Sequence, residues 1–317
     1  MNKAIILLGL IAMALPCVAQ IDHFPDQKWK ETKTDHFTIR TQSESATKAK
    51  KYAEKVWEIC NRTMPGLKEE YQNNSFVTHS GEAGSEDKPF RFTIYLVKNI
   101  TPFREMVDKA TANMGDRAHG YKQLCLTTKM LPDSKHRYVV FCMEDRKSDI
   151  DALLVHSVAS AILAGHSRMR NKNFFHTAGY GYYAEHLIFK KCQVHYLDFN
   201  RYYENVEIVR GEVLDGSSPW TRPIQKMVRR GELEPKLAKV FTTTVDGLNP
   251  PRSGLLLALA HFMCHDEENV KKHHAYLKKL RAGESASTDL ILECYGYDSL
   301  DAFDAAWKEY ILSRKFR

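Results

Sequence analysis

The chain has 317 residues and a formal net charge of +7, with 46 Lys and Arg against 39 Asp and Glu. Acidic and basic residues are interleaved, as in Lys68-Glu69-Glu70, and no aromatic-plus-basic stacking motif accompanies them. This pattern is typical of a solvated surface and argues against a nucleic-acid-binding protein. The length suits one large domain or two closely packed ones.

The N-terminal residues have the features of a secretory signal peptide. Lys3 supplies a positive charge, residues 4–15 are almost entirely apolar, and small residues at positions 17–19 offer a cleavage site. The apolar run is too short to span a bilayer as a helix. A lipoprotein anchored at Cys17 is disfavoured by Pro16 immediately before it. We therefore expect a signal peptide at 1–19 and a secreted or periplasmic mature chain without a membrane span.

Cysteine usage leaves the redox state open. Of seven cysteines, one lies in the predicted signal, and their spacings match no zinc-binding pattern. An even number in an exported protein permits disulfides, but pairing cannot be deduced from sequence, and buried free thiols are the alternative. The six that remain are Cys60, Cys125, Cys142, Cys192, Cys264 and Cys294.

The first half of the mature chain carries mainly strand signals. Alternating apolar residues predict a strand at 36–41, and apolar residues at helical spacing predict a helix over 46–60. A loop rich in Ser, Gly, Asn and Glu follows at 73–88, and strands are expected at 90–97 and 138–142. We interpret residues 20–146 as a strand-rich subdomain with a small mixed sheet.

The second half is predicted to be helical. Residues 150–164 are apolar almost all round, with Ser148 and Asp151 as a start signal and Gly165 as a stop. Further helices are expected at 175–191, in short segments of 220–245, at 253–264 and at the C-terminal end, capped by Asp298 or Ser299. Strands first and helices after indicate an α+β protein, with a helical subdomain at 147–317.

Two central helices carry a family resemblance. Residues 154–160 read Leu-Val-His-Ser-Val-Ala-Ser, and residues 175–185 read Phe-His-Thr-Ala-Gly-Tyr-Gly-Tyr-Tyr-Ala-Glu. The order of elements over most of residues 36–312 resembles the gluzincin (thermolysin-like, peptidase MA-like) zinc metallopeptidases. In that group a sheet-rich front precedes a buried helix with His-Glu-x-x-His, and a second helix supplies a Glu ligand. The resemblance implies a zincin-like fold.

The chain departs from the family at the positions that carry the chemistry. His156 matches the first zinc histidine, but Ser157 stands at the general-base Glu, Ser160 at the second histidine and Ala178 at the ligand Glu. A catalytic zinc site needs three protein ligands, and a Glu must take the proton of the metal-bound water. We therefore expect an inactive pseudopeptidase with vestigial positions, no catalytic residue and no cofactor.

Two catalytic alternatives stay open. A hydrolase or peptidase could use a rearranged zinc site built around His156 and His176, with Glu185 as a third ligand; His166 and His186 are further donors nearby. A serine hydrolase could instead use His156 with Ser160 one helical turn later, although the sequence identifies no orienting carboxylate and no oxyanion hole.

A binding role uses the same region. The ligand-binding candidates are His156, His176, Tyr180 and Tyr182, because aromatic side chains suit a peptide or protein partner. An open groove beside an edge strand would favour peptide binding by strand addition, whereas a cleft filled by Tyr182 would favour a structural protein. The run Lys271-Lys272-His273-His274 is expected to be a solvated helix face.

Overall fold

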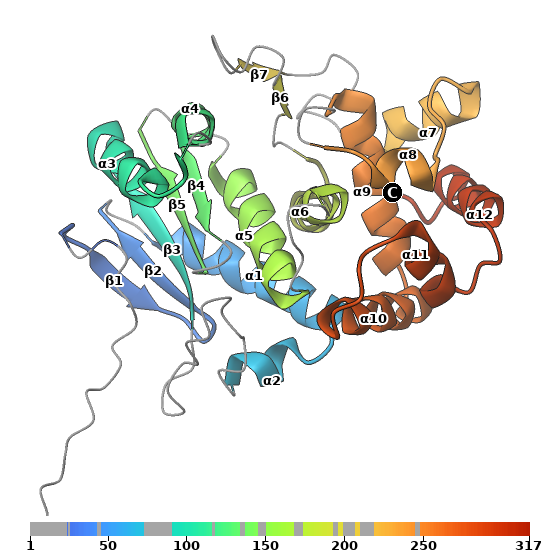
Figure 1. Cartoon of the computed structure of the whole chain (residues 1–317), viewed down its shortest axis with the longest axis horizontal. Coiled ribbons are helices and arrows are strands. Elements are labelled where there is room, and N and C mark those ends of the chain that lie inside the picture. Colours follow the sequence, from blue (N-terminus) through green and yellow to red (C-terminus); the bar gives the residue numbers. More distant parts are fainter. Residues whose placement is uncertain are drawn as a thin grey trace, which may run out of the picture.

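The computed structural model of the chain describes residues 24, 26–42, 46–72, 91–115, 118–133, 137–144, 150–167, 174–192, 196–198, 207–209, 219–244 and 248–317. Within these residues a five-stranded sheet with its helices is followed by a mostly helical half (Figure 1). The predicted α+β class is thus confirmed as mixed α and β structure. The predicted signal peptide at 1–19 and the predicted loop at 73–88 lie outside the described residues.

The sheet has the strand order β1-β2-β3-β5-β4. Its three central strands pair in parallel, and the two outer strands pair antiparallel to their neighbours. The three central strands coincide with the predicted ones, and both outer strands were missed. The strands are β1 (Lys30–Lys33), β2 (Phe37–Thr41), β3 (Phe92–Val97), β4 (Met130–Asp133) and β5 (Tyr138–Cys142). A two-stranded sheet joins β6 (Tyr196–Asp198) to β7 (Glu207–Val209).

Both faces of the central sheet are buried. In β3, Ile94 and Leu96 join the main core, whereas Tyr95 and Val97 join a second cluster on the opposite face. Successive side chains of a strand point to opposite faces, so this division follows from the period of two. Helices cover both faces (Figure 1), which explains why the central strands are apolar throughout rather than alternating with polar residues.

Helices also contribute more to the first half than the sequence analysis expected. The predicted helix at 46–60 is present, and three more helices join it, so strands do not dominate this part of the chain. On α3, Phe103, Met106 and Val107 form the buried stripe that packs on the sheet. The four helices are α1 (Thr47–Thr63), α2 (Leu67–Gln72), α3 (Ile100–Thr111) and α4 (Ala118–Thr128).

The second half is helical, as predicted, apart from the short β6–β7 pair. The predicted helices at 150–164, 175–191 and 253–264 correspond to α5, α6 and α9. Gly165 was expected to end the first of these, but it lies within α5. The helices are α5 (Ile150–His166), α6 (Phe174–Phe189), α7 (Thr221–Arg230), α8 (Leu237–Phe241), α9 (Pro250–Cys264), α10 (Glu267–Arg281), α11 (Thr288–Tyr295) and α12 (Leu300–Leu312).

Side-chain caps fix where four consecutive helices of this half begin. Each capping oxygen accepts a hydrogen bond from the backbone N–H three residues later, which satisfies a donor that the first helical turn leaves without a partner. Of the two caps predicted for the last helix, Ser299 is the one used. The caps are Asn249 for α9, Asp266 for α10, Ser287 for α11 and Ser299 for α12.

One hydrophobic core runs through both halves. It contains Phe37 and Ile39 of β2 as well as Trp307 and Phe316 near the end of the chain. The packing therefore gives no boundary between residues 20–146 and 147–317. All six cysteines of the predicted mature chain are free thiols, and five of them are buried. No helix of the described part is long and apolar enough to cross a membrane.

Candidate functional site

The two helices that carry the family resemblance pack directly against each other. His156, early in α5, meets Glu185 near the end of α6, whereas Ser160, one turn later in α5, meets Thr177 near the start of α6. The helices therefore run in opposite directions along this contact. α6 also packs on α9, so it lies between two apolar helices (Figure 1).

His156 is held by a buried carboxylate and an aromatic ring. Its Nδ1 lies 2.8 Å from Oε1 of Glu185, whose side chain is 0% exposed, while the histidine side chain is 15% exposed. The Tyr182 ring stands edge-on to the imidazole at 4.7 Å between centroids, and Tyr182 also packs on Trp220 at 5.0 Å. Because a carboxylate only accepts, Nδ1 carries the proton in this contact.

Two glycines let α6 approach both of its neighbours closely. A Cβ added at Gly181 would lie 2.6 Å from Oγ of Ser160 and 2.8 Å from two ring carbons of His156. A Cβ at Gly179 would lie 2.6 Å from the backbone oxygen of Leu256 on α9. Glycine in a helix interior is destabilising relative to alanine by about 1 kcal/mol. At these two positions the close packing of the helices offsets that cost.

The four positions that were matched to the metallopeptidase motif all make packing or hydrogen-bond contacts. Ser157 is buried and donates to Sδ of Met130 on β4 at 2.7 Å. Ser160 donates to the carbonyl oxygen of Thr177 at 2.9 Å, which ties α5 to α6. Ala178, buried at 6% exposure, faces α5 together with Tyr182, one turn further along α6.

These residues do not fit a zinc ion. Of the four matched positions, only His156 offers a nitrogen donor, and zinc sites are built from Cys, His, Asp and Glu ligands. Nor does the described part of the chain contain any group of three or more His, Cys, Asp or Glu side chains arranged to hold a metal ion. No step through a metal follows from this site. The absence of a bound metal itself stays a prediction.

His176 belongs to a different cluster. It is buried, and its Nε2 lies 3.0 Å from Nε2 of His273 on α10, whose Nδ1 lies 3.0 Å from the carbonyl oxygen of Thr63. A carbonyl only accepts, so His273 is protonated on Nδ1 and accepts through Nε2 from the Nε2–H of His176. His273 is completely buried, so the expected solvated face at residues 271–274 is wrong for this residue, whereas Lys271 is exposed as expected.

Burial keeps this histidine pair neutral. It lowers the pKa of His273 to about 4, against a smaller opposing effect of the hydrogen bond to Thr63. Burial, followed by repulsion from His273, lowers the pKa of His176 well below its usual range. His176 and Glu185 are nine residues apart on α6, about 13.5 Å along the axis. The structure therefore brings together His156 and Glu185 but not His156 and His176.

The aromatic candidates are inside the protein. Tyr180 is 0% exposed and shares a short hydrogen bond with the Thr63 hydroxyl, and Tyr182 is 2% exposed. Burial raises the pKa of Tyr180 well above its ordinary value, so its hydroxyl stays protonated. Of the four predicted ligand-binding residues, His156 is the one with appreciable exposure. Tyr182 packs beside it, between the imidazole and the ring of Trp220.

The edge strand beside α5 offers little for strand addition. Cys142 N–H donates to the Lys129 carbonyl at 2.9 Å, and this register turns the backbone groups of Met130 and Pro132 away from β5. Pro132 has no N–H, and its carbonyl accepts from the Tyr121 hydroxyl at 2.9 Å. Proline and covering side chains are common means of protecting a sheet edge.

The remaining donors considered from the sequence have partners elsewhere. His166 lies 2.8 Å from Glu70 of α2, and burial lowers its pKa to about 4. Nε2 of His186 lies 3.0 Å from the backbone oxygen of Arg317. Sequence reasoning missed Glu185 as the carboxylate that orients His156; its position on the α5-facing side of α6, seven residues after Ala178, was the available signal.

Comparisons with known proteins leave the family open. The chain matches no protein-family model, no curated protein and no solved structure.

Proposed function

We propose that this protein is an exported, metallopeptidase-like protein that has lost catalysis and serves a binding or scaffolding role. The export half of the proposal is supported by the signal-like residues 1–19. The observation that carries the loss of catalysis is the occupation of the vestigial positions. Ser157, Ser160 and Ala178 pack or hydrogen-bond inside the protein, and each lacks the chemistry that its position would need for zinc hydrolysis.

The arrangement also bears on how a partner would bind. Tyr182 packs beside His156, and the edge strand β4 has no N–H at Pro132, whose carbonyl accepts from the Tyr121 hydroxyl. In the described residues, Met114 is the large apolar side chain that stands exposed. These features favour a partner that contacts polar outer surfaces over a peptide laid into the former cleft.

The rearranged metal site is the weaker alternative. It requires His156, His176 and Glu185 around one ion, yet His176 faces His273, about 13.5 Å along α6 from Glu185. A ligand set of this kind would need α6 to unwind.

Hydrolysis through Ser160 is a second candidate that one observation favours. Glu185 supplies the orienting carboxylate that the sequence did not reveal, at 2.8 Å from His156. A nucleophilic serine must also pass its proton to the histidine, whereas the Ser160 hydroxyl donates to the Thr177 carbonyl. We expect a broad serine-reactive probe to leave the native protein unlabelled; labelling that disappears in Ser160→Ala would establish this candidate instead.

The proposal is tested by peptide cleavage in the mature chain, residues 20–317. The protein is incubated with zinc and a diverse peptide mixture, and products are read by mass spectrometry. We expect the wild type to match His156→Ala and the control His119→Ala, which alters an exposed histidine of α4. Cleavage that is lost in His156→Ala but kept in His119→Ala would contradict the loss of catalysis.

The proposed binding role is tested by a separate experiment. Cross-linking in the native exported fraction should recover a defined partner at fixed stoichiometry, and His156→Ala should leave that partner unchanged because the contact lies on outer surfaces. If His156→Ala loses the partner while circular dichroism shows an intact fold, the partner binds in the cleft beside His156 instead.

A further inference from the structure

A basic cavity lies where the end of α6 meets the first turn of α7. Its volume is about 360 Å³, within the range of about 300–1,000 Å³ that is typical of small-molecule sites. The cationic side chains of Lys190, Arg222 and Arg317 line it, together with His186 and Gln225, and its described lining contains no Asp or Glu. Even if a main-chain carboxylate at Arg317 is counted against them, the side-chain charges leave an excess of positive charge.

Within the described part of the chain, the cations of this cavity have no acidic partner. Throughout the described residues, no ion pair involves Lys190, Arg222 or Arg317. Lys190 also acts on the interior: burial is the main cause that lowers the pKa of His186, and the positive charge of Lys190 lowers it further. Like charges held together repel one another, and a bound anion would relieve that repulsion.

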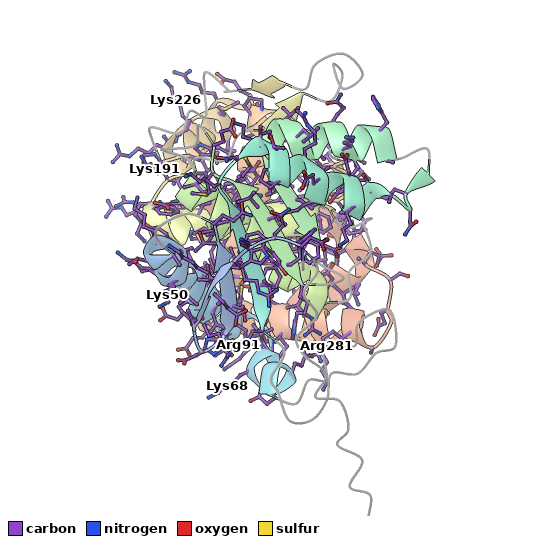
Figure 2. All side chains as sticks on the ribbon, turned by 90° about the vertical axis from the view of Figure 1, so that its left-hand side faces the viewer. Lys50, Lys68, Arg91, Lys191, Lys226 and Arg281 are labelled. Atoms are coloured by element: carbon purple, nitrogen blue, oxygen red, sulfur yellow. The ribbon has the colours of Figure 1, made fainter. Side chains whose placement is uncertain are left out.

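Helix α7 adds a favourable anion environment. Its N-cap residue, Trp220, provides no side-chain acceptor, and its first turn contains no acidic residue. The N-terminus of a helix carries partial positive charge and free N–H donors, so a cation such as Arg222 there is unfavourable without an anion. Lys226, one turn after Arg222, and Lys191, next to Lys190, project from the same side of the molecule (Figure 2).

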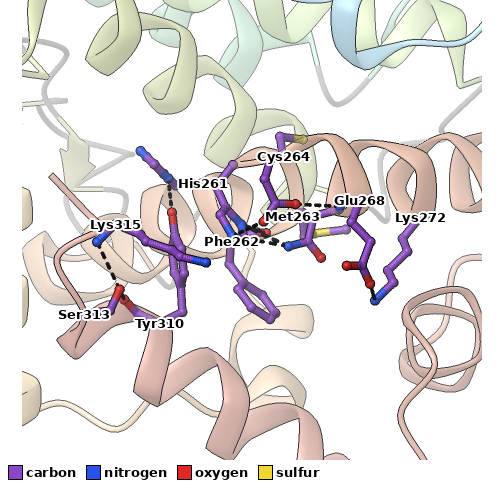
Figure 3. Close-up of polar contacts among 12 residues, drawn as sticks. His261, Phe262, Met263, Cys264, Glu268, Lys272, Tyr310, Ser313 and Lys315 are labelled. Atoms are coloured by element: carbon purple, nitrogen blue, oxygen red, sulfur yellow. Dashed lines mark hydrogen bonds and ion pairs between the residues drawn. The ribbon is translucent and has the colours of Figure 1, made fainter.

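The C-terminal tail is anchored so that Arg317 reaches the cavity. The Gln225 side-chain amide donates to the carbonyls of Ile311, Ser313 and Phe316 at 2.8, 2.9 and 3.2 Å. Phe316 is fully buried, and its ring packs against Tyr310, which hydrogen-bonds to His261 of α9 at 2.6 Å (Figure 3). The cavity wall is thus preformed.

His186 contributes a buried imidazole to the wall of this cavity. The residue is 2% exposed, Nε2 donates to the Arg317 backbone oxygen, and Nδ1 is buried without a hydrogen-bond partner. Buried polar atoms are usually satisfied by protein or water. With its proton on Nε2, the imidazole leaves only a lone pair on Nδ1, so this atom is not a contact for an oxyanion.

We propose that this cavity binds a small molecule through a phosphate or sulfate group. The guanidinium groups of Arg222 and Arg317 suit bidentate contacts with such oxyanions, and Lys190 adds a point charge. The cavity exceeds the space a lone oxyanion needs, so the remainder of the ligand has room. The site lies away from His156, and it does not depend on the proposed loss of catalysis.

The first test measures binding of inorganic phosphate by calorimetry at constant ionic strength. We compare the wild type with Arg222→Gln, Lys190→Gln and the control Arg229→Gln, which removes the same charge from the far end of α7. Arg222 is exposed and unpaired, so its replacement leaves the fold intact. We expect Kd to rise at least about tenfold in Arg222→Gln and Lys190→Gln and to stay unchanged in Arg229→Gln.

A second arm identifies the source of the anionic group. Sedimentation with phosphatidylcholine vesicles, with and without phosphatidylglycerol, tests a lipid headgroup. Binding only to the anionic vesicles, lost in Arg222→Gln but kept in Arg229→Gln, supports the site and assigns it to a membrane lipid. Phosphate binding without vesicle binding supports it and assigns it to a free ligand.

Two results overturn the proposal. One is that neither phosphate nor anionic vesicles bind to the wild type. The other is that Arg229→Gln weakens binding as much as Arg222→Gln does, because this would show general attraction to a basic protein rather than a site.

Discussion

Helix α6 presents two very different environments. Along its middle, Gly179 and Gly181 bring it into close contact with α9 and α5, and its polar groups there are paired, as His156 is with Glu185 and Ser160 with Thr177. At its C-terminal end the helix borders an open cavity lined by unpaired cations. The region that resembles an active site is therefore closed by packing, and the region with free charge lies where no family motif points.

The largest expected effect comes from Gly179→Ala. Its Cβ would meet the backbone oxygen of Leu256 at 2.6 Å, and a backbone atom cannot rotate away. We expect a loss of about 3 kcal/mol in the free energy of unfolding despite alanine's better helix propensity. Urea unfolding followed by circular dichroism measures it. An unchanged or raised stability would contradict the close contact between α6 and α9.

Gly181→Ala should cost less, about 2 kcal/mol, because it meets side-chain atoms of Ser160 and His156 that can move. The loss should shrink in a His156→Ala background, since the imidazole is then gone. The Gly179→Ala loss should be the same in both backgrounds. A double-mutant cycle gives the two coupling energies, and equal coupling for both glycines would refute the assignment of their contacts.

Glu185→Ala should destabilise the protein by about 2 to 3 kcal/mol, because it leaves the Nδ1–H of His156 without its acceptor. Glu185→Gln keeps an acceptor of similar shape and should cost less than half as much. Thermal or urea unfolding of both variants checks the order. If Gln is as damaging as Ala, the charge rather than the hydrogen bond carries the interaction.

Stability should fall as the pH drops from about 6.5 to about 4. Burial lowers the pKa of His273 and of His166 to about 4, below the unfolded value near 6.5, so the unfolded chain binds more protons in this window. The stabilisation is complete above pH 6.5 and is lost as the pH falls through the folded values. Each extra proton adds about 1.4 kcal/mol per pH unit.

His273→Gln isolates part of this pH effect. A glutamine amide can donate to the Thr63 carbonyl and accept from His176, yet it does not titrate. Its unfolding free energy should therefore vary less with pH than that of the wild type. Parallel pH profiles for the two proteins would show that the His176–His273 pair is not the source.

The smallest effect on stability should come from the cavity. Arg222→Gln removes an exposed cation from a helix N-terminus, so we expect a change within about 0.5 kcal/mol, with any shift toward greater stability. Thermal unfolding without phosphate or sulfate measures it. A loss as large as that of Glu185→Ala would mean that Arg222 is part of the packed structure, and the contrast between the two regions would fail.

The features that could be predicted from the sequence were those with a strong local pattern. The central strands and the nearly all-apolar helices α5 and α9 depend on burial of contiguous residues. The edge strand β4, which contains Pro132, gives no alternation to detect. The helix α3 did carry an apolar stripe at Phe103, Met106 and Val107, so it could have been predicted.

For the candidate site, the sequence indicated which helices carry the residues but not which side chains contact one another. The two helices that carry His156, Ser157, Ser160 and Ala178 pack on each other. His273 could not be placed, because its polar neighbours indicate exposure and its partners, Thr63 and His176, are distant in sequence. The cavity is formed by the end of α6, the start of α7 and Arg317. These segments are distant in sequence, so no local pattern predicts that they lie together.

The central claim of the proposal is that the site at His156 does not bind zinc. The most direct measurement is zinc per mole of purified mature protein by elemental mass spectrometry, without an affinity tag or chelator. The account predicts well under one zinc per chain, unchanged by His156→Ala. A content near one tightly held zinc per chain that is lost in His156→Ala would contradict the claim. It would favour an active zinc peptidase.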